Sequence, residues 1–404
     1  MNLALMGFGT VGTGVEEILF EKKDFLLQKG FNINLSKVLI YNANKKRNPK
    51  NKEIVFTDDF NEILNSNVDT VIDVTSNLEE TYKRIIALMN AGKNIITANK
   101  AVVSKYFEEL NETAIKNNVY FSYEASVGGA IPIIHPLMEE LQFNKISEIS
   151  GILNGTSNFI LSKMESEGLD YNIVLKEAQD LGYAEADPTA DVCGFDSQRK
   201  IRILSSLSFN TKIREDEILT LGISNISKSD IDFAKSKGYN IRLIAKSFLK
   251  DGKINIYVMP VLLKDPFFIN TIESLNKVQI KGENFGEYRF FGAGAGKLET
   301  ADAVIRDLLR IHDDNEIKPF YSGSENFSVT TKDFSNKYYI RVSDVNKTLE
   351  KFMDTDEEKE THHIITKEIN LDELKEILES YDNEIFVAAV EEEIWSFYQL
   401  EMKI

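Results

Sequence analysis

The chain has 404 residues, 43% of them hydrophobic, which is long enough for two or three packed domains with a sizeable core. The 64 acidic and 47 basic residues give a net charge of −17, which argues against nucleic acid as a partner, because phosphate binding depends on clustered Lys and Arg. The single cysteine, Cys193, excludes an internal disulfide and a Cys-based zinc site. The expected partner is a small, water-borne substrate.

The N-terminal segment does not resemble a targeting sequence. Its apolar run, Leu3–Met6, is too short for a signal peptide, and no basic region precedes it. No stretch of the chain approaches the roughly 20 apolar residues that a membrane span requires. We therefore expect a cytoplasmic protein.

Residues 1 to about 125 alternate short apolar runs with polar helical stretches. This alternation predicts an α/β fold with a parallel sheet. The runs expected to form successive strands are Leu3–Met6, Val38–Tyr41, Thr70–Val74, Asn94–Thr97 and Val119–Tyr123.

A glycine-rich turn follows the first of these strands. It reads Gly7-Phe8-Gly9-Thr10-Val11-Gly12 and opens a helix expected from about Val11 to Leu27. Glycines at this spacing let the backbone turn sharply and approach a pyrophosphate, whose charge then lies at the helix N-terminus. The strand before the turn and the helix after it favour dinucleotide binding. The alternative is a glycine turn used only for packing.

The end of the second strand bears on the choice of cofactor. An NAD-selective site usually has an acid there for the ribose hydroxyls, whereas this chain has Tyr41-Asn42-Ala43-Asn44 followed by Lys45, Lys46 and Arg47. The missing acid and the three cations would suit the 2′-phosphate of NADP. The alternative is a solvated surface loop.

Two further segments follow expected strands. Lys100 lies just beyond Asn94–Thr97, at the edge where open α/β sheets hold their ligands, although by position alone it could equally be a surface lysine. The segment Glu124–Pro132 contains Gly128 and Gly129, where main-chain carbonyls can turn inward. By itself this segment is only a tight turn.

Between Asn144 and about Pro319 the pattern becomes α+β. Strands such as Ile254–Met259 are interleaved with helices such as Asp196–Phe209. This pattern of strands and helices predicts a second domain of a different type from the first.

The densest group of charged residues lies in this second region. It runs from Leu181 to Asp191 and continues with Asp196 and Lys200, which are four residues apart and would share one face of a helix. Acids could bind the ammonium of an amino acid substrate, and a lysine can take a hydroxyl proton when burial and neighbouring cations lower its pKa. The alternative is a solvated acidic loop with a helix cap and an ordinary ion pair.

A Ser-, Asn- and Lys-rich stretch around Ser322–Lys337 is an expected linker into a third unit. With a turn at Trp395, the elements of that unit predict the order β-α-β-β-α-β of a ferredoxin-like fold. The expected strands are Tyr338–Val342, Thr361–Ile369, Glu384–Glu391 and Ser396–Met402, and the expected helices are Val345–Met353 and Leu371–Ser380.

Seven strings of the sequence resemble, in order and spacing, the homoserine dehydrogenases. They cover about residues 3 to 312 and read GFGTVG, ITANKA, EASVGGAIP, GILNGTSNFI, LGYAEADPTADVCGFDSQRK, GYNIRLIA and FFGAGAGKLETADAV. The resemblance implies NAD(P)-dependent interconversion of L-aspartate 4-semialdehyde and L-homoserine, in threonine and methionine biosynthesis, by a homodimer or higher homo-oligomer.

The resemblance also implies a domain organisation. A Rossmann-type nucleotide-binding domain would occupy residues 1–125, and a helix at about 300–316 would return to it. A substrate-binding and dimerisation domain would follow at 126–320. The C-terminal unit, residues 335–404, resembles an ACT domain, a ferredoxin-like regulatory module.

The family's functional residues correspond to particular positions here. Lys200 resembles the proton donor and acceptor, and Lys100 resembles the second active-site lysine, near both nicotinamide and substrate. The substrate-binding acids correspond to Glu185, Asp191 and Asp196. A monovalent cation such as sodium would be bound by the main-chain carbonyls of Glu124, Val127, Gly129 and Ile131.

Three segments depart from the family pattern. After the third strand the family has paired glycines where this chain has Asp73-Val74-Thr75-Ser76-Asn77, in which Thr75 is the expected cofactor contact. The segment Lys264–Phe267 lacks the histidine often found before the proline. After Ser343-Asp344, Val345-Asn346 replaces the Pro-Gly of a turn that often holds an amino acid effector.

Two other functions remain open at this stage. One is a different NAD(P) oxidoreductase, acting on another small amino or keto acid. The other is a non-catalytic ligand-sensing protein on the same scaffold, although the presence of Lys100, Glu185 and Lys200 argues against it.

Overall fold

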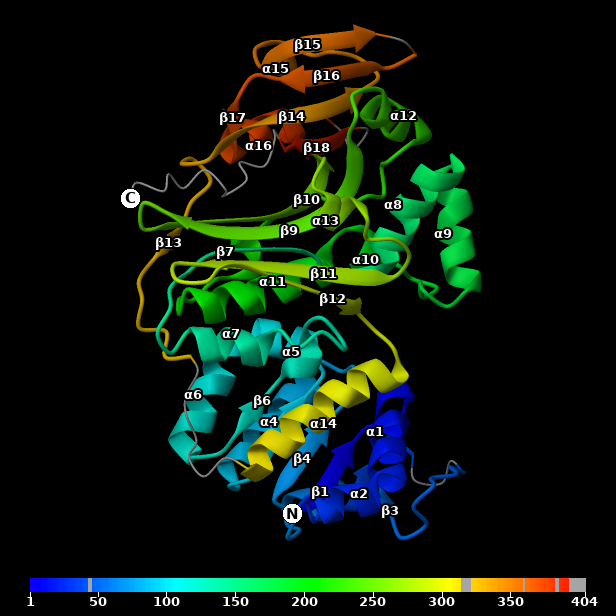
Figure 1. Ribbon diagram of the computed structural model, residues 1–404, viewed down its shortest axis with the longest axis vertical. Helices are drawn as coiled ribbons and strands as arrows, with labels where there is room; N and C mark the ends of the chain where they lie inside the picture. Colours follow the sequence, from blue (N-terminus) through cyan, green and yellow to red (C-terminus); the bar gives the residue numbers. More distant parts are fainter. Residues whose placement is uncertain (43–45, 314–320, 359, 382–384, 392–404) are drawn as a thin grey trace, which may run out of the picture. The chain divides into compact units, whose positions relative to one another are not determined.

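The computed structural model describes residues 1–42, 46–313, 321–358, 360–381 and 385–391 (Figure 1). Its residues cluster into two compact units. Unit 1 comprises Met1–Ile149, Arg199–Glu217 and Val278–Phe327, and unit 2 comprises Ser150–Gln198, Ile218–Lys277 and Ser328–Ile404. The division into three domains remains a prediction.

Unit 1 contains a six-stranded parallel sheet in the order β3-β2-β1-β4-β5-β6. This is the order of the doubly wound nucleotide-binding fold, in which ligands lie beyond the carboxyl ends of the strands where the order reverses, here between β1 and β4. Strands are present at all five expected places, although the second runs from Asn34 to Leu39 and not from Val38 to Tyr41. β3 is an additional strand, too short to show a pattern of its own. The strands are β1 (Asn2–Met6), β2 (Asn34–Leu39), β3 (Val55–Thr57), β4 (Thr70–Asp73), β5 (Asn94–Thr97) and β6 (Phe121–Ser122).

The helices of unit 1 follow its strands along the chain. The single helix expected from about Val11 to Leu27 is two helices, because the backbone at Lys22 leaves the helical region with ψ 8°. The helices are α1 (Thr10–Glu21), α2 (Lys23–Gln28), α3 (Phe60–Leu64), α4 (Glu79–Asn90), α5 (Lys100–Lys105), α6 (Phe107–Asn117), α7 (Ile134–Glu140) and α14 (Lys297–Asp313), with 3₁₀ turns η1 (Glu124–Ser126) and η2 (Glu215–Glu217).

Helix α14 is distant in sequence from the parallel sheet but shares its core. Ala301, Val304 and Leu308 of α14 are fully buried in the same hydrophobic cluster as Leu3 and Leu5 of β1. Helix α1 allows a close approach at Gly14, where an added Cβ would lie 2.7 Å from the Lys297 carbonyl oxygen. Residues 297–313 therefore return to the N-terminal sheet.

Unit 2 is built on the long antiparallel hairpin of β9 (Asn240–Lys250) and β10 (Lys253–Leu263). Its further strands are β8 (Leu219–Thr220), β13 (Ser328–Val329), β14 (Ser335–Val342), β15 (Met353–Glu358), β16 (His362–Thr366), β17 (Ile369–Asn370) and β18 (Phe386–Val390). Its helices are α8 (Gly155–Glu167), α9 (Tyr171–Asp180), α10 (Thr189–Val192), α12 (Lys228–Ser236), α13 (Pro266–Ile269), α15 (Lys347–Glu350) and α16 (Leu371–Glu379).

The remaining elements lie at the boundaries between these sequence ranges. β7 (Ile146–Ile152), α11 (Phe195–Ser208) and β11 (Leu275–Gly282) each have residues in both units, and β12 (Gly286–Ala293) belongs to unit 1. Helix α11 corresponds to the helix expected at Asp196–Phe209, and β10 contains the strand expected at Ile254–Met259.

The C-terminal part of unit 2, residues 335–391, has the expected ferredoxin-like order, but not from the expected elements, which in chain order run β-α-β-α-β-β. Apart from the two-residue β17, the order β14, α15, β15, β16, α16, β18 is β-α-β-β-α-β. The strands pair antiparallel in the order β18-β14-β16-β15, an arrangement typical of ferredoxin-like folds.

Several details of this C-terminal part differ from the prediction. The helix expected at Val345–Met353 ends at Glu350, and residues 353–358 form β15, because pairing with β16 decides the conformation of a segment too charged to show strand alternation. The expected linker at Ser322–Lys337 contains β13 and the start of β14. The strand expected at Ser396–Met402 lies outside the described residues.

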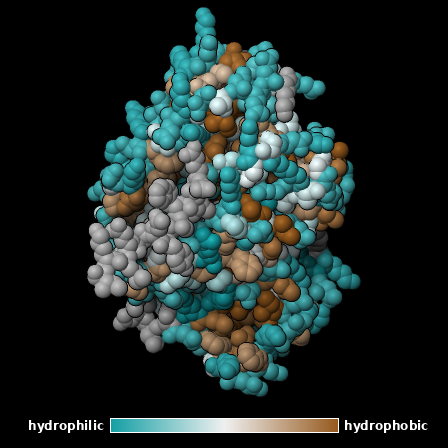
Figure 2. Space-filling model, turned by 45° about the horizontal axis from the view of Figure 1, so that its top comes forward, coloured by the Kyte–Doolittle hydropathy of each residue, from teal (hydrophilic) through white to brown (hydrophobic). Residues whose placement is uncertain are grey.

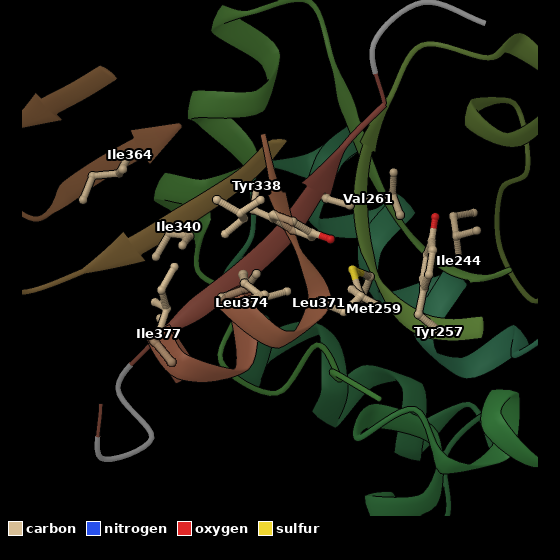
Figure 3. Packing of buried hydrophobic residues seen from close by; sticks show 14 of the residues in the cluster. Ile244, Tyr257, Met259, Val261, Tyr338, Ile340, Ile364, Leu371, Leu374 and Ile377 are labelled. Carbon is tan, nitrogen blue, oxygen red and sulfur yellow. The ribbon is translucent and has the colours of Figure 1, made fainter. Parts of the chain in front are cut away.

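The C-terminal part is joined to the hairpin by both backbone pairing and side-chain packing. Strand β18 pairs in parallel with β10, with Val261 opposite Ala389 and Leu262 opposite Val390. Figure 3 shows side chains from β10, such as Met259, close to Leu371 at the start of α16, and all belong to one buried cluster. These residues form one core within unit 2.

Among the described residues, no helix has the length and apolar character needed to cross a membrane. The face seen in Figure 2 is covered mostly by hydrophilic residues, with hydrophobic ones in separate patches.

Candidate active site

The glycine-rich turn has the geometry that a bound pyrophosphate needs. Gly7 adopts φ +98°, and a Cβ on Gly12 would lie 2.4 Å from the Gly7 carbonyl oxygen, so both positions favour glycine. A Cβ on Gly9 would meet nothing within 4 Å, which leaves open space above the turn. Helix α1 begins at Thr10 with no side-chain cap on its N-terminus. Its first N–H groups are thus positioned to bind an anion.

A buried carboxylate organises the carboxyl edge of the sheet beside this turn. Asp73, the last residue of β4, is fully buried and accepts hydrogen bonds from the Thr75 backbone N–H (3.1 Å), the Thr75 hydroxyl (2.6 Å) and the Thr97 hydroxyl of β5 (2.7 Å). Burial raises the pKa of Asp73 to about 6, while these hydrogen bonds act to lower it. The expected cofactor contact Thr75 is therefore held by Asp73.

Asn99 links the same edge to the helix that carries Lys100. Its side-chain amide donates to the carbonyl oxygens of Thr75 (3.0 Å) and Asn77 (3.2 Å), and its side-chain oxygen accepts from the Val102 N–H (3.2 Å) as the cap of α5. Lys100 is the first residue of that helix and is half-buried. Asn99 thus positions Lys100 at the carboxyl end of β5, where the sequence placed it.

The loop after β2 is exposed. Tyr41 is fully exposed, Arg47 donates to the Asn42 carbonyl oxygen (2.9 Å), and its guanidinium lies over the Phe56 ring at 5.9 Å from the centroid. Lys45, one of the three cations expected to favour NADP, lies outside the described residues.

The turn at residues 124–131 contains two left-handed glycines, Gly128 (φ +78°) and Gly129 (φ +57°). The carboxylate of Glu124 accepts the backbone N–H groups of Ile133, Ile134 and His135 at 2.7 to 3.0 Å. The cation ligands expected at this turn are the main-chain carbonyls. No cluster of three His, Cys, Asp or Glu suited to a metal is found in the described part of the chain.

The two acids expected to line the substrate pocket are joined by one amide. Asn154, which follows β7, donates from its side chain to Asp191 (2.7 Å) and Asp196 (2.9 Å). Its side-chain oxygen caps α8 by accepting from the Ser157 N–H (2.7 Å). Asp196 is only 2% exposed, so this carboxylate does not face bulk solvent.

The acids that precede α10 are more open to solvent. Glu185 and Asp187 are both exposed. Asp187 accepts from the backbone N–H (3.1 Å) and hydroxyl (2.5 Å) of Thr189, and these hydrogen bonds lower the pKa of its carboxyl. Of the segment 185–196, the structure joins Asp191 and Asp196 through Asn154, while Glu185 stays on the surface of unit 2.

Lys200 lies on α11 and is only 6% exposed, so it does not face bulk solvent. Two residues further along, Arg202 donates to both carboxylate oxygens of Glu108 on α6 (2.7 and 2.9 Å). Ser104, on the helix that begins with Lys100, donates to Glu215 at 2.5 Å, shortly after α11 ends. Within unit 1, α11, which carries Lys200, is therefore joined to α6, and α5, which begins with Lys100, is joined to the segment that follows α11.

Sequence reasoning did not assign Asp73, Thr97, Asn99 and Asn154. All four are polar residues at or just beyond the carboxyl end of a buried strand. This position in the sequence could have indicated a role in the site. Asn154 also stands within the string GILNGTSNFI, where it precedes a helix in the manner of an N-cap.

Comparison with known proteins agrees with this geometry. The family described as homoserine dehydrogenase matches residues 132–309, and the NAD binding domain of homoserine dehydrogenase matches residues 7–124. The homoserine dehydrogenase of Bacillus subtilis (strain 168) is 40% identical over 314 residues, which cover 77% of this chain and 72% of that protein.

Solved structures show the same likeness. A homoserine dehydrogenase from Thiobacillus denitrificans has a TM-score of 0.87 at 29% identity, covering 97% of this chain and 98% of that one. A hyperthermophilic archaeal homoserine dehydrogenase in complex with NADPH has a TM-score of 0.66 at 26% identity, covering 78% of this chain and 99% of that one. The chain belongs to the homoserine dehydrogenase family of NAD(P)-dependent oxidoreductases.

Proposed function

We propose that the protein interconverts L-aspartate 4-semialdehyde and L-homoserine with NADP(H), and that Lys200 is the group that exchanges the proton on the reacting oxygen. The observation that carries the proposal is the burial of Lys200 one helical turn from the buried Asp196. A buried lysine beside charged groups is an unusual structural feature, and it is the environment in which a lysine can act as a general acid and base.

The proton step assigns distinct roles to the two lysines. In the reducing direction Lys200 donates a proton to the carbonyl oxygen as it gains negative charge, and in the oxidising direction Lys200 accepts the hydroxyl proton. Lys100 is the first residue of the helix that Asn99 caps at the end of β5, and in this proposal its positive charge stabilises the developing oxyanion. When bound, the nicotinamide cofactor supplies or accepts the hydride.

The acids of unit 2 recognise the amino end of the substrate. Glu185, Asp191 and Asp196 bring negative charge to bind its ammonium, and Asn154 holds two of these carboxylates in one geometry. Binding a charged end of a small substrate orients its reacting carbon, which supplies much of the rate enhancement.

The loop after β2 favours NADP over NAD. Lys46 and Arg47 follow an exposed stretch with no acid to bind the ribose hydroxyls, so a 2′-phosphate would find cations there. Gly7, Phe8, Gly9, Thr10, Val11, Gly12 and Thr75 are the proposed cofactor contacts.

Two accessory features belong to the same proposal. A monovalent cation such as sodium would be bound by the main-chain carbonyls of Glu124, Val127, Gly129 and Ile131, and replacing sodium with a large organic cation should lower activity. We also expect a homodimer, which sedimentation of the purified protein would test.

The reaction is tested first with a substrate panel. NADPH oxidation is followed with L-aspartate 4-semialdehyde and with other small amino and keto aldehydes or acids. The four-carbon semialdehyde should have the highest kcat/KM, and NADPH should be preferred over NADH. A higher kcat/KM with another substrate would replace the proposed reaction, and cofactor binding without turnover would point to a ligand-sensing protein.

The proton role is tested with Lys200→Met. This variant should lose about 1000-fold in kcat with the KM for NADPH changed by less than about twofold, because the side chain is replaced by an uncharged one of similar length. Lys105→Met is the matched control, since Lys105 is an exposed lysine of α5 paired with Glu79, and its kcat should stay within about twofold. Near-normal turnover by Lys200→Met would remove the proposed role.

A further inference from the structure

The segment between β8 and α12, residues 221–227, lies between the C-terminal part of unit 2 and the acids proposed to bind substrate. At one end it follows β8 along β10, where the Leu221 N–H donates to the Val258 carbonyl oxygen at 2.7 Å. At the other end it becomes the capping box of α12, formed by Ser227 and Asp230. We call residues 221–226 the bridging loop.

The bridging loop is in direct backbone contact with the end of α10. The Ile223 N–H donates to the Val192 carbonyl oxygen at 2.7 Å. A Cβ on Gly222 would lie 2.2 Å from that same oxygen and 2.5 Å from the Cα of Cys193. The loop therefore packs without a gap against the short segment between Asp191 and Asp196.

The C-terminal part holds the bridging loop on its other side through Asn225. The Arg341 guanidinium of β14 donates to the Asn225 carbonyl oxygen at 2.7 Å, and the Asn225 side-chain amide donates to the Ile385 carbonyl oxygen at 3.2 Å. A cavity of about 330 Å³ lies between the loop and the C-terminal part, lined among others by Ser224, Tyr381 and Val387. These two hydrogen bonds of Asn225 therefore join the loop to the C-terminal part beside this cavity.

Arg341 is itself held by a buried carboxylate. Its Nε donates to both oxygens of Asp230 at 2.9 and 3.0 Å, and Asp230 is fully buried. Asp230 also accepts from the Tyr339 hydroxyl at 2.7 Å, which lies 2.8 Å from His363 Nδ1. An arginine suits this position, because the several N–H groups of its planar guanidinium can donate to the carboxylate and to the Asn225 carbonyl at the same time.

We propose that Arg341 is a positioning residue for substrate binding: it holds the bridging loop through Asn225, and the loop holds α10 and the carboxylates of Asp191 and Asp196. The proposal rests on the proposed role of these two acids in binding the substrate ammonium. The C-terminal part of the chain then contributes to the affinity of the active site without touching the substrate.

The test compares three variants by steady-state kinetics and thermal unfolding. Arg341→Lys keeps the charge beside Asp230 but cannot bridge Asp230 and Asn225, and it should raise the KM for the semialdehyde about tenfold. Gly222→Ala should also raise that KM, because it pushes directly on the Val192 carbonyl. In both variants kcat and the KM for NADPH should stay within about twofold, which a general loss of stability would not produce.

Tyr339→Phe is the matched control. It removes a hydrogen bond from the same carboxylate, Asp230, and so lowers Tm, but it leaves Asn225 and the bridging loop untouched. Its KM for the semialdehyde should stay unchanged. An unchanged KM in Arg341→Lys, or an equal rise in Tyr339→Phe, would overturn the proposal.

Asp191→Asn tests the substrate role of the acids separately from the positioning role of Arg341. If Asp191→Asn raises the KM for the semialdehyde and Arg341→Lys does not, the acids bind substrate and only the role of Arg341 is wrong. If Asp191→Asn leaves that KM unchanged, the proposed substrate role of the acids fails and the positioning role fails with it.

Discussion

The glycine-rich turn at residues 7–12 and the acidic segment at residues 185–196 are both proposed to bind charged groups, but they are built in different ways. The turn is made by neighbours in sequence, because Gly12 packs against Gly7 and α1 follows at once. The acidic segment is positioned by residues far along the chain, Asn154 before it and Gly222 after it. The first is a local structure, whereas the second depends on the tertiary contacts of unit 2.

The largest effect is expected in the glycine-rich turn. Gly12→Ala places a methyl group 2.4 Å from the Gly7 carbonyl oxygen and should lower the free energy of unfolding by about 3 kcal/mol, with a marked rise in the KM for NADPH. Gly9→Ala is the control for stability, because its methyl group would meet no protein atom within 4 Å, so its free energy of unfolding should stay unchanged. Chemical denaturation measures the free energy of unfolding of both variants, and cofactor titration measures NADPH binding by Gly12→Ala. An equal loss of unfolding free energy in the two variants would show that the turn is not held by the Gly7–Gly12 contact.

A pH-dependent effect of similar size is expected at Asp73. Its folded pKa of about 6 lies above its ordinary value of 3.8, so the protonated form contributes stability that is present in full below about pH 4 and lost as the pH rises through about 6. Two pKa units correspond to about 3 kcal/mol. Asp73→Asn does not titrate, so it should gain about that much stability relative to the wild type between pH 4 and pH 8. Parallel pH profiles of the two unfolding free energies would contradict the raised pKa.

A smaller effect is expected in the acidic segment. It should change the KM for the substrate and not the KM for the cofactor. Asn154→Ala removes the amide that joins Asp191 and Asp196 and should raise the KM for the semialdehyde about 20-fold, with the KM for NADPH unchanged. The matched control is Asn158→Ala. Asn158 is a buried asparagine of the same helix that donates to main-chain carbonyls of residues 271–275, so its loss should lower Tm without changing either KM. A rise in KM for both variants would mean that α8 as a whole, and not the amide, positions the acids.

The smallest effect is expected at the loop after β2. Arg47→Ala should raise the KM for NADPH about fivefold and leave the KM for NADH unchanged, because a partly exposed cation near a phosphate contributes about 1 kcal/mol. Lys29→Ala, a change at an exposed lysine beyond α2, is the control. If Arg47→Ala raised the KM for NADPH and the KM for NADH by the same factor, the loop would not bind the 2′-phosphate.

The same contrast explains which parts of the fold and site could be predicted. The strands of unit 1, the glycine-rich turn and the position of Lys100 follow from apolar runs and from residues that directly follow them. Helix α11 was also predicted, and with it the spacing of Asp196 and Lys200. The edge strand β15 was missed, because only its pairing with β16 distinguishes it from a charged loop or helix end.

The sequence by itself therefore determined the local structures: the dinucleotide turn, the alternation of strands and helices, and the family to which the chain belongs. Only the tertiary structure decided that Asn99 and Asn154 hold the candidate site residues and that β18 pairs with β10. The physical reason is that periodicity and turn chemistry act between near neighbours in sequence, whereas these contacts join segments tens of residues or more apart, whose meeting depends on how the whole unit packs.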